Sequence, residues 1–360
     1  MVILNTRTMS EEGMKILAFT NGTASHIWRF DPLVRRFHAK TPHQMAVTNF
    51  DQWNDETLGA DIIILEMISG QHQVDTAHNL GAKVIYEADD AVIDSYGEER
   101  KNLMHLGDHG RKSAIETIRK CDAITVTNQT LAENYARFTD KPIYVLPIYM
   151  DYEYYGDVIE MKQPERNTDE IRIGWFGSKG HFEDLRMILP AVREVLEKHE
   201  NVKFVYCGYG GMESDRLSQQ VQWGEDVFKE IPRHRREFHP GAPAHYWKYK
   251  HRFLDLDIGL CPLVDDYFNK NKVATKWLEY SALETPSICS PTVYGDVVKH
   301  NETGFIANTV GEWTHYMNKL IEDAEERNRI GQGASKEVFH KHNFENHWKD
   351  WERAYLEVLK

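Results

Sequence analysis

Short apolar runs that alternate with helical stretches are the feature that most constrains the fold of this chain. The runs at 14–20, 60–67 and 82–90 are rich in aliphatic residues and have the length of strands buried on both faces. Strands that alternate with helices predict a parallel sheet with helices on its faces. Similar runs recur at 122–128, 142–150, 171–177, 202–208, 256–263, 286–291 and 304–308, with a shorter strand expected near 236–241.

The alternation stops once and then restarts. Residues 151–170 are polar and aperiodic, which predicts a linker. We therefore expect an N-terminal Rossmann-like domain over 14–155 and a C-terminal Rossmann-like domain over 166–342. The tail at 343–360 has the pattern of an amphipathic helix, and we expect it to pack back toward the N-terminal domain.

Composition limits the class of protein. Among 360 residues the hydrophobic fraction is 41% and the charged fraction 28%, as in globular proteins, and no apolar run is long enough to span a membrane. The net charge of −13 disfavours a protein that coats nucleic acid or anionic lipid with its whole surface. Without a signal-peptide pattern at the start, we expect a cytoplasmic protein. Four widely spaced cysteines without a CxxC pair indicate buried thiols.

The segment FNKNKVATKWLEYSALETPSI, residues 268–288, carries the strongest local signal. Its apolar residues recur at helical spacing, and Lys272 and Lys276 stand at the start of that helix, where the helix dipole disfavours cations. A bound phosphate would reverse that preference, and Glu279 could then reach hydroxyl groups attached to it, such as those of a ribose. The alternative is a solvated lysine pair with a surface glutamate, and spacing alone does not decide.

A second loop, FGSKGHFEDL at 176–185, also joins a strand to a helix. Gly177 permits a tight turn, while Ser178, Lys179 and the start of the following helix could bind phosphate oxygens. The alternative is an ordinary strand-to-helix turn with His181 beside the helix cap. Neither a Walker A motif nor a GxGxxG fingerprint is present.

Taken together, these segments resemble nucleotide-sugar glycosyltransferases of the GT-B fold, in particular glycosyltransferase family 4. The resemblance covers nearly the whole chain from about residue 14 and is most specific over 268–290. It implies two Rossmann-like parallel-sheet domains that face each other across a cleft, with a nucleoside-diphosphate sugar as donor substrate and no cofactor. The segments that carry it are 28–33, 81–90, 121–135, 144–151, 174–185, 254–290 and 303–323.

The resemblance also implies roles for individual residues. Glu279 matches the carboxylate that binds the donor ribose, and Lys272 and Lys276 fall where the family stabilises the departing diphosphate. In the first half, we expect Asp90, or alternatively Glu87, to orient or deprotonate the acceptor hydroxyl. The other residues expected to bind substrate are Gly22, Glu87, Asp89, Gly177, Ser178, Lys179, His181, Asn271 and Thr275.

The sequence departs from the family pattern in three places. Asn271 replaces the first of two carboxylates, near the sugar, and Glu284 replaces a glycine, so we expect a tight turn to be lost there. The strand end at 87–90 reads EADD, where many family members carry a histidine. The DLD sequence at 255–257 spells a metal-binding motif, but it lies in the apolar start of a strand, and we interpret it as structural, with no metal site.

We therefore expect transfer of a hexose or pentose to an acceptor hydroxyl, with retention of anomeric configuration and without a metal. The acceptor is either a glycan or other envelope precursor, or a hydroxymethylated DNA base, which would have to be flipped out of the duplex. The basic stretch at 233–252 could contact an acidic acceptor, but a solvated helix and loop is the simpler interpretation. A non-catalytic sugar-nucleotide sensor and a sugar-nucleotide epimerase of the same fold are the alternatives. The sequence does not indicate an oligomeric state.

Overall fold

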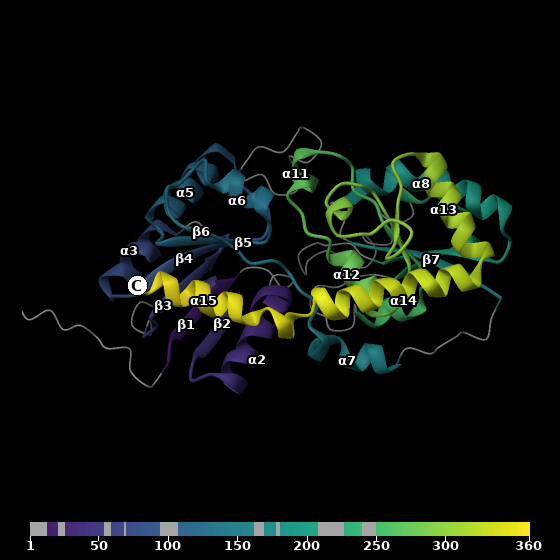
Figure 1. Ribbon diagram of the computed structural model, residues 1–360. Coiled ribbons are helices and arrows are strands. Elements are labelled where there is room, and N and C mark those ends of the chain that lie inside the picture. Colours follow the sequence, from purple (N-terminus) through teal and green to yellow (C-terminus); the bar gives the residue numbers. More distant parts are fainter. Residues whose placement is uncertain are drawn as a thin grey trace, which may run out of the picture. The chain divides into compact units, whose positions relative to one another are not determined.

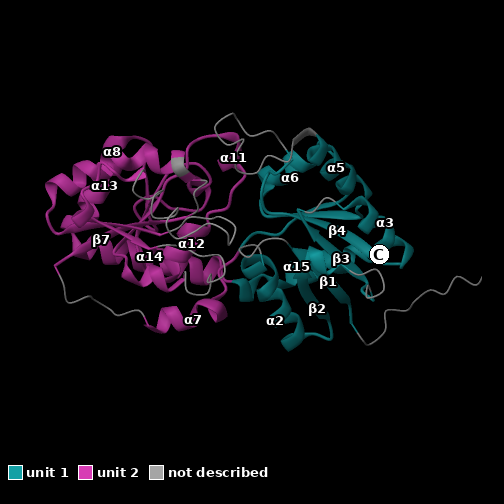
Figure 2. Ribbon diagram, turned by 180° about the vertical axis from the view of Figure 1, so that it is seen from behind, with its two compact units in different colours: residues 1–148, 344–360 teal, residues 149–343 magenta. Residues whose placement is uncertain are grey.

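The computed structural model divides into two compact units, which we describe one at a time (Figure 2). Unit 1 comprises residues 1–148 and 344–360, and unit 2 comprises residues 149–343. The C-terminal helix α15 (Trp348–Val358) thus belongs to the unit that contains the N-terminus. The structure describes residues 13–20, 26–53, 59–67, 70–93, 107–161, 169–177, 181–207, 227–239 and 250–360.

Unit 1 contains a six-stranded parallel sheet with the order β2-β1-β3-β4-β5-β6 (Figure 1). The predicted parallel α/β architecture is confirmed, but the sequence pattern missed β2 (Gln44–Asn49), an edge strand in which only Met45 is buried. The other strands are β1 (Lys15–Thr20), β3 (Ile62–Glu66), β4 (Lys83–Ala88), β5 (Ala123–Val126) and β6 (Ile143–Val145). Besides α15, the helices are a π-helix (His26–Phe30), α2 (Asp31–Lys40), α3 (Gln71–Asn79), α5 (Gly107–Lys120), α6 (Gln129–Tyr135) and two short 3-10 turns, Phe50–Gln52 and Phe344–Asn346.

Unit 2 contains a second six-stranded parallel sheet, with the order β12-β11-β10-β7-β8-β9. Its strands are β7 (Ile171–Phe176), β8 (Val202–Cys207), β9 (Arg236–His239), β10 (Ile258–Cys261), β11 (Ser287–Cys289) and β12 (Phe305–Ile306). Its helices are α7 (Tyr152–Met161), α8 (Phe182–Lys198), α11 (Tyr267–Lys270), α12 (Thr275–Ala282), α13 (Val310–Glu322) and α14 (Ala324–Lys341), with 3-10 turns at Arg233–Arg235, Lys250–Asp255 and Tyr294–Asp296.

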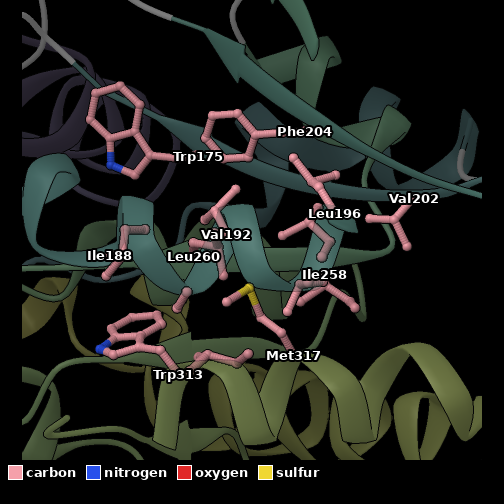
Figure 3. Close-up of a cluster of buried hydrophobic side chains, with 14 of the residues drawn as sticks. Trp175, Ile188, Val192, Leu196, Val202, Phe204, Ile258, Leu260, Trp313 and Met317 are labelled. Carbon is pink, nitrogen blue, oxygen red and sulfur yellow. The ribbon is translucent and has the colours of Figure 1, made fainter. Parts of the chain in front are cut away.

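The main core of unit 2 lies between its sheet and the helices α8 and α13 (Figure 3). Helix α8 has a continuous apolar stripe, because residues four apart lie on one helical face. On the opposite face of the sheet, the ring of Tyr280 in α12 lies so close to Gly259 of β10 that an added Cβ would approach it to 2.4 Å. The core side chains labelled in the figure are Trp175, Ile188, Val192, Leu196, Val202, Phe204, Ile258, Leu260, Trp313 and Met317.

The predicted linker at 151–170 is partly wrong. Residues Tyr152–Met161 form helix α7, and the division between the units lies earlier, after Ile148. Two contacts tie α7 into unit 2: the buried ammonium of Lys250 pairs with Asp157 at 2.5 Å, and Tyr155 binds Glu279. Hydrophobic periodicity was too weak to reveal this helix, because only Tyr155 and Val158 are buried among its residues.

The expected loss of a tight turn at Glu284 is also wrong. Glu284 adopts a left-handed conformation with φ of 53°, so the turn is kept without the family's glycine. A non-glycine residue in this region costs about 1–2 kcal/mol. Close packing explains why the turn persists, since an added Cβ on Gly331 of α14 would lie 2.0 Å from the carbonyl oxygen of Glu284.

Two further observations concern the described residues. All four cysteines, Cys121, Cys207, Cys261 and Cys289, are free and buried, as expected. In the part of the chain that the structure describes, no helix combines the length and the apolar character needed to cross a membrane.

Candidate functional site

The lysine-rich segment lies directly after β10, at the C-terminal edge of the unit 2 sheet, which is the edge where parallel sheets bind ligands. Asp266 caps α11 by accepting the backbone N–H of Asn269 at 2.7 Å. Helix α12 starts at Thr275, so Lys276 lies in its first turn, whereas Lys272 precedes the helix. The expectation that both lysines open one helix therefore holds only for Lys276.

Lys276 is a partly buried cation near the N-terminus of α12. Its ammonium lies 6.0 Å from the centre of the Trp175 ring, and no carboxylate among the described residues forms an ion pair with it. Burial is the main cause that lowers the pKa of Lys276, and the charge of Lys272 adds to it, against the opposing negative charges of Glu279 and Asp184. The positive end of the α12 dipole acts in the same direction. Burial, the Lys272 charge and the helix dipole all disfavour the charged ammonium. An anion bound at this position would offset their combined effect.

His181 lies at the start of α8, beside the same lysine. Its ring centre is 6.1 Å from that of Trp175, and its Nδ1 atom is 2.7 Å from Oδ2 of Asp184. Burial first, and then the charges of Lys276 and Lys272, lower the pKa of His181 to about 4 despite the Asp184 carboxylate. The imidazole is therefore neutral at physiological pH.

Asp184 is a site residue that the sequence analysis missed. Its side chain is fully buried, and its Oδ1 atom accepts the backbone N–H of Val264 at 2.7 Å and the side-chain amide of Asn269 at 2.8 Å. One carboxylate thus joins the start of α8 to the loop that carries α11. A signal was present, because Asp184 lies one helical turn before the buried Ile188 and so occupies the apolar stripe of α8.

Glu279 lies one turn after Lys276 on α12, and its carboxylate is buried. Its Oε1 atom accepts a hydrogen bond of 2.7 Å from the hydroxyl of Tyr155 in α7. Burial raises the pKa of Glu279 to about 7, against the opposing effects of Tyr155 and Lys276. The alternative of an exposed surface glutamate is therefore wrong, since this side chain is only 3% exposed.

Three other predicted residues surround these groups. Asn271 is buried and donates its side-chain amide to the carbonyl of Tyr267 at 2.7 Å, which fastens the end of α11. Thr275 is the first residue of α12. Gly177 follows β7, and a Cβ there would lie 2.5 Å from the Trp175 ring, so packing alone requires a glycine. Gly22, Ser178 and Lys179 lie outside the described residues.

In unit 1, Glu87 lies near the end of β4 and Asp89 and Asp90 follow the strand, but Glu87 has a structural partner. Its buried carboxylate pairs with the buried guanidinium of Arg29 at 2.6 Å and accepts the hydroxyl of Thr125. The carbonyl of Asp90 accepts the hydroxyl of Tyr135 at 3.0 Å. Asp89 and Asp90 are partly buried and so are more exposed than Glu87.

The DLD sequence has the structural role that we expected. Asp257 accepts the backbone N–H of Arg172 at 2.7 Å, and the carbonyl of Asp255 accepts the Arg172 side chain at 3.0 Å. These bonds join the start of β10 to that of β7, at the end of the sheet opposite to Lys276.

No family model and no curated protein sequence matches the chain. Solved structures do resemble it. HepE of Anabaena in complex with UDP-glucose has a TM-score of 0.66 and 12% identity, covering 96% of this chain and 100% of HepE. An alpha-glucosyltransferase in complex with UDP-glucose and DNA containing an abasic site has a TM-score of 0.62 and 14% identity, covering 97% and 100%.

TarM has a TM-score of 0.61 and 12% identity over 83% of this chain, but the match spans only 54% of TarM. The chain therefore corresponds to about half the length of that protein. At such low identities the likeness establishes the fold: this chain has the GT-B fold of these glycosyltransferases, with two Rossmann-like parallel sheets, as the sequence resemblance implied.

Proposed function

We propose that this protein is a glycosyltransferase that moves a sugar from a nucleoside-diphosphate sugar to an acceptor hydroxyl. The observation that carries the proposal is Lys276, a partly buried cation in the first turn of α12 that forms no ion pair among the described residues. A cation held in this way is stabilised when an anion binds. A diphosphate next to the helix N-terminus would supply the missing charge.

The chemistry follows from the same geometry. Breaking the bond between sugar and diphosphate leaves negative charge on the diphosphate, and a fixed ammonium aimed at that charge stabilises the transition state more than the ground state. Lys276 is already placed, so little reorganisation is required, and Lys272 adds positive charge nearby. We propose that these cations and the α12 backbone N–H groups act without a metal ion.

Glu279 is proposed to bind the donor ribose. Tyr155 engages its Oε1 atom and orients the carboxylate, and Oε2 would accept a ribose hydroxyl. Burial raises the pKa of Glu279, and a ribose hydroxyl that donates to Oε2 would stabilise the charged carboxylate, as the Tyr155 hydroxyl does. We propose retention of anomeric configuration by the family resemblance, with Asp90 of unit 1 acting on the acceptor hydroxyl.

Two acceptors are considered, a glycan or envelope precursor and a hydroxymethylated DNA base. The DNA in the alpha-glucosyltransferase complex favours testing the second. The basic stretch at 233–252 gives the DNA acceptor only limited support, because two of its cations are engaged within the protein. Arg235 binds the carbonyl of Val202 at 2.9 Å, and Lys250 pairs with Asp157. If duplex DNA is the acceptor, its binding should weaken steeply with salt. Only Arg233 and Arg236 should be replaced in that test, since Arg235 stabilises the fold.

The decisive experiment is incubation with UDP-, ADP- and GDP-sugars and candidate acceptors, followed by assay of the released nucleoside diphosphate. We expect release with one nucleotide, unchanged activity in EDTA, and a retained anomer by NMR of the product. Binding without release would favour the non-catalytic sensor, and appearance of an epimerised donor would favour the epimerase. Loss of activity in EDTA that Mn²⁺ or Mg²⁺ restores would refute metal independence.

A further inference from the structure

The proposed diphosphate site uses Lys276 and assigns no role to the pair formed by His181 and Asp184, although the charges of Lys276 and of this pair act on each other. The geometry of the pair fixes the position of one proton. A carboxylate can only accept hydrogen bonds, so the Nδ1 atom that lies 2.7 Å from Asp184 Oδ2 must carry a hydrogen. The other oxygen of Asp184 already accepts two N–H donors, from Val264 and Asn269, so the carboxylate is held rigidly.

The state of the second ring nitrogen follows from the charges around it. The charged groups that face His181 are Asp184 on its own helix and the two cations Lys276 and Lys272 from the α11–α12 segment. Two cations and burial outweigh one carboxylate, in agreement with the lowered pKa of the ring. With Nδ1 protonated and the ring neutral, Nε2 presents a lone pair and no hydrogen.

We propose that Asp184 is a positioning residue that holds His181 as a neutral hydrogen-bond acceptor, and that Nε2 of His181 binds a hydroxyl of the transferred sugar. This inference rests on the proposed function and assigns its sugar contact. A phosphate oxygen is itself an acceptor, so Nε2 in this state cannot bind the diphosphate, which is left to Lys276. Hydroxyl groups are the donors that suit such an atom. Because the ribose hydroxyls are assigned to Glu279, we assign a hydroxyl of the transferred sugar to Nε2 of His181.

Binding the diphosphate through Lys276 and the sugar through His181 has a consequence for ligand specificity. If His181 were protonated, it would add a third positive charge near the diphosphate and would bind a free nucleoside diphosphate as well as the intact donor. A neutral acceptor instead discriminates the intact donor from the diphosphate product. His181 would also compensate for Asn271, which stands where the family has a carboxylate near the sugar and whose amide is engaged by Tyr267.

The first test is spectroscopic and requires no ligand. In ¹⁵N-histidine NMR spectra of the full chain, assigned by comparison with His181→Ala, the His181 ring should show the neutral Nδ1–H form at pH 7. In Asp184→Asn, the asparagine oxygen can still accept from Val264 and Asn269, and its NH₂ group then faces Nδ1. The ring should therefore switch to the Nε2–H form. A protonated ring in the wild type, or an unchanged tautomer in a folded Asp184→Asn, would overturn the assignment.

The second test is calorimetric titration with UDP, ADP and GDP and with the glucose conjugate of each. His181→Ala and Asp184→Asn should weaken the intact donor by roughly 10- to 100-fold, as expected when a buried hydrogen-bond partner is removed, and free diphosphate by less than about twofold. Glu183→Gln is the matched control, because it removes a carboxylate from the same turn of α8 at a side chain that is 40% exposed. It should change neither affinity.

The outcomes separate the two proposals. An equal loss of affinity for donor and diphosphate in both variants would place His181 on a group that both ligands share, the diphosphate or the ribose, and would contradict this inference while leaving the proposed function intact. No loss for either ligand would also contradict it. Absence of nucleotide binding by the wild type would count against the proposed function and, with it, against the sugar contact. His181→Ala keeps the second test decisive if Asp184→Asn does not fold.

Discussion

One buried cation of unit 1, Arg29, and one partly buried cation of unit 2, Lys276, have opposite electrostatic surroundings. In unit 1, the guanidinium of Arg29 and the carboxylate of Glu87 are each 1% exposed and lie 2.6 Å apart. Arg29 also donates to the carbonyl of Leu146, and the Trp351 ring of α15 lies 5.4 Å from it. In unit 2, the ammonium of Lys276 lies 6.0 Å from the centre of the Trp175 ring, and none of the described carboxylates forms an ion pair with it, although Glu279 and Asp184 lie near enough for their charges to act on it.

The difference distinguishes a structural charge from one that awaits a ligand. Burying a charge costs several kcal/mol unless a partner and hydrogen bonds compensate for it. The partners of Arg29 come from the chain itself, so its role is complete without any substrate. Lys276 lacks such a partner among the described residues, which is the reason to seek one in the substrate. This distinction is testable because replacing the two residues should have opposite effects.

The largest effect is expected from Arg29→Met. Leaving the Glu87 carboxylate buried without its partner should lower the free energy of unfolding by about 3–5 kcal/mol. Urea denaturation followed by tryptophan fluorescence measures this loss, and Arg29→Met with Glu87→Leu should recover much of it. Donor affinity, a property of unit 2, should be unchanged while the protein is folded. A loss below about 1 kcal/mol would mean that the pair contributes little.

Lys276→Met should have the opposite effect to Arg29→Met: it should reduce activity and leave stability intact. Turnover should fall by roughly 10²–10³-fold, because the leaving diphosphate loses its closest cation, while stability should be unchanged or higher. Lys272→Met should act in the same direction, and the double variant should cost less than the product of the two, since both act on one developing charge. Wild-type turnover in both single variants would show that these lysines are only solvated side chains.

The pH dependence of stability sharpens the comparison further. Burial raises the pKa of Glu279 from 4.5 to about 7, so its stabilising contribution is complete below pH 4.5 and is lost as the pH rises to about 7. The pKa of His181 is lowered from 6.5 to about 4, so its contribution is complete above pH 6.5 and is lost as the pH falls to about 4.

These two slopes have opposite signs and similar size, about 1.4 kcal/mol per pH unit at most. They should nearly cancel in the wild type between pH 4.5 and 6.5, their range of overlap. Glu279→Gln should uncover a stability that rises with pH, and His181→Ala one that falls. Tyr155→Phe should move the Glu279 slope to higher pH, because the lost hydrogen bond stabilised the carboxylate. Parallel stability curves for all four proteins would contradict these assignments.

The smallest effect is expected from Lys270→Met, the matched control for the other lysines. Lys270 pairs with Asp265 at 2.8 Å, but the two side chains are 57% and 71% exposed. Surface ion pairs contribute little, so stability should change by less than about 0.5 kcal/mol and turnover should not change. A large loss of activity would show that positive charge anywhere on this segment matters, and the special role of Lys276 would fail.

The sequence by itself determined the architecture. Short aliphatic runs between helical stretches cannot be buried except in a covered parallel sheet, and this local pattern was enough to identify both units and eleven of the strands in the two sheets. The sequence analysis did not predict strand β2, because an edge strand buries few residues and so lacks the apolar pattern. The sequence pattern missed helix α7 because only Tyr155 and Val158 of its residues are buried, too few to show a helical period.

The sequence also located the segment around Lys276, since a cation in the first turn of a helix is unusual for local reasons. Only the tertiary structure decided which charges are partnered. The contact between Arg29 and Glu87 joins residues 58 positions apart, that between Tyr155 and Glu279 joins residues 124 apart, and Asp184 reaches Asn269 across 85. Burial and hydrogen-bond partners depend on how the elements pack, and no local pattern records such distant neighbours. The same residue types were therefore assigned to structure or to chemistry only when the fold brought their partners together.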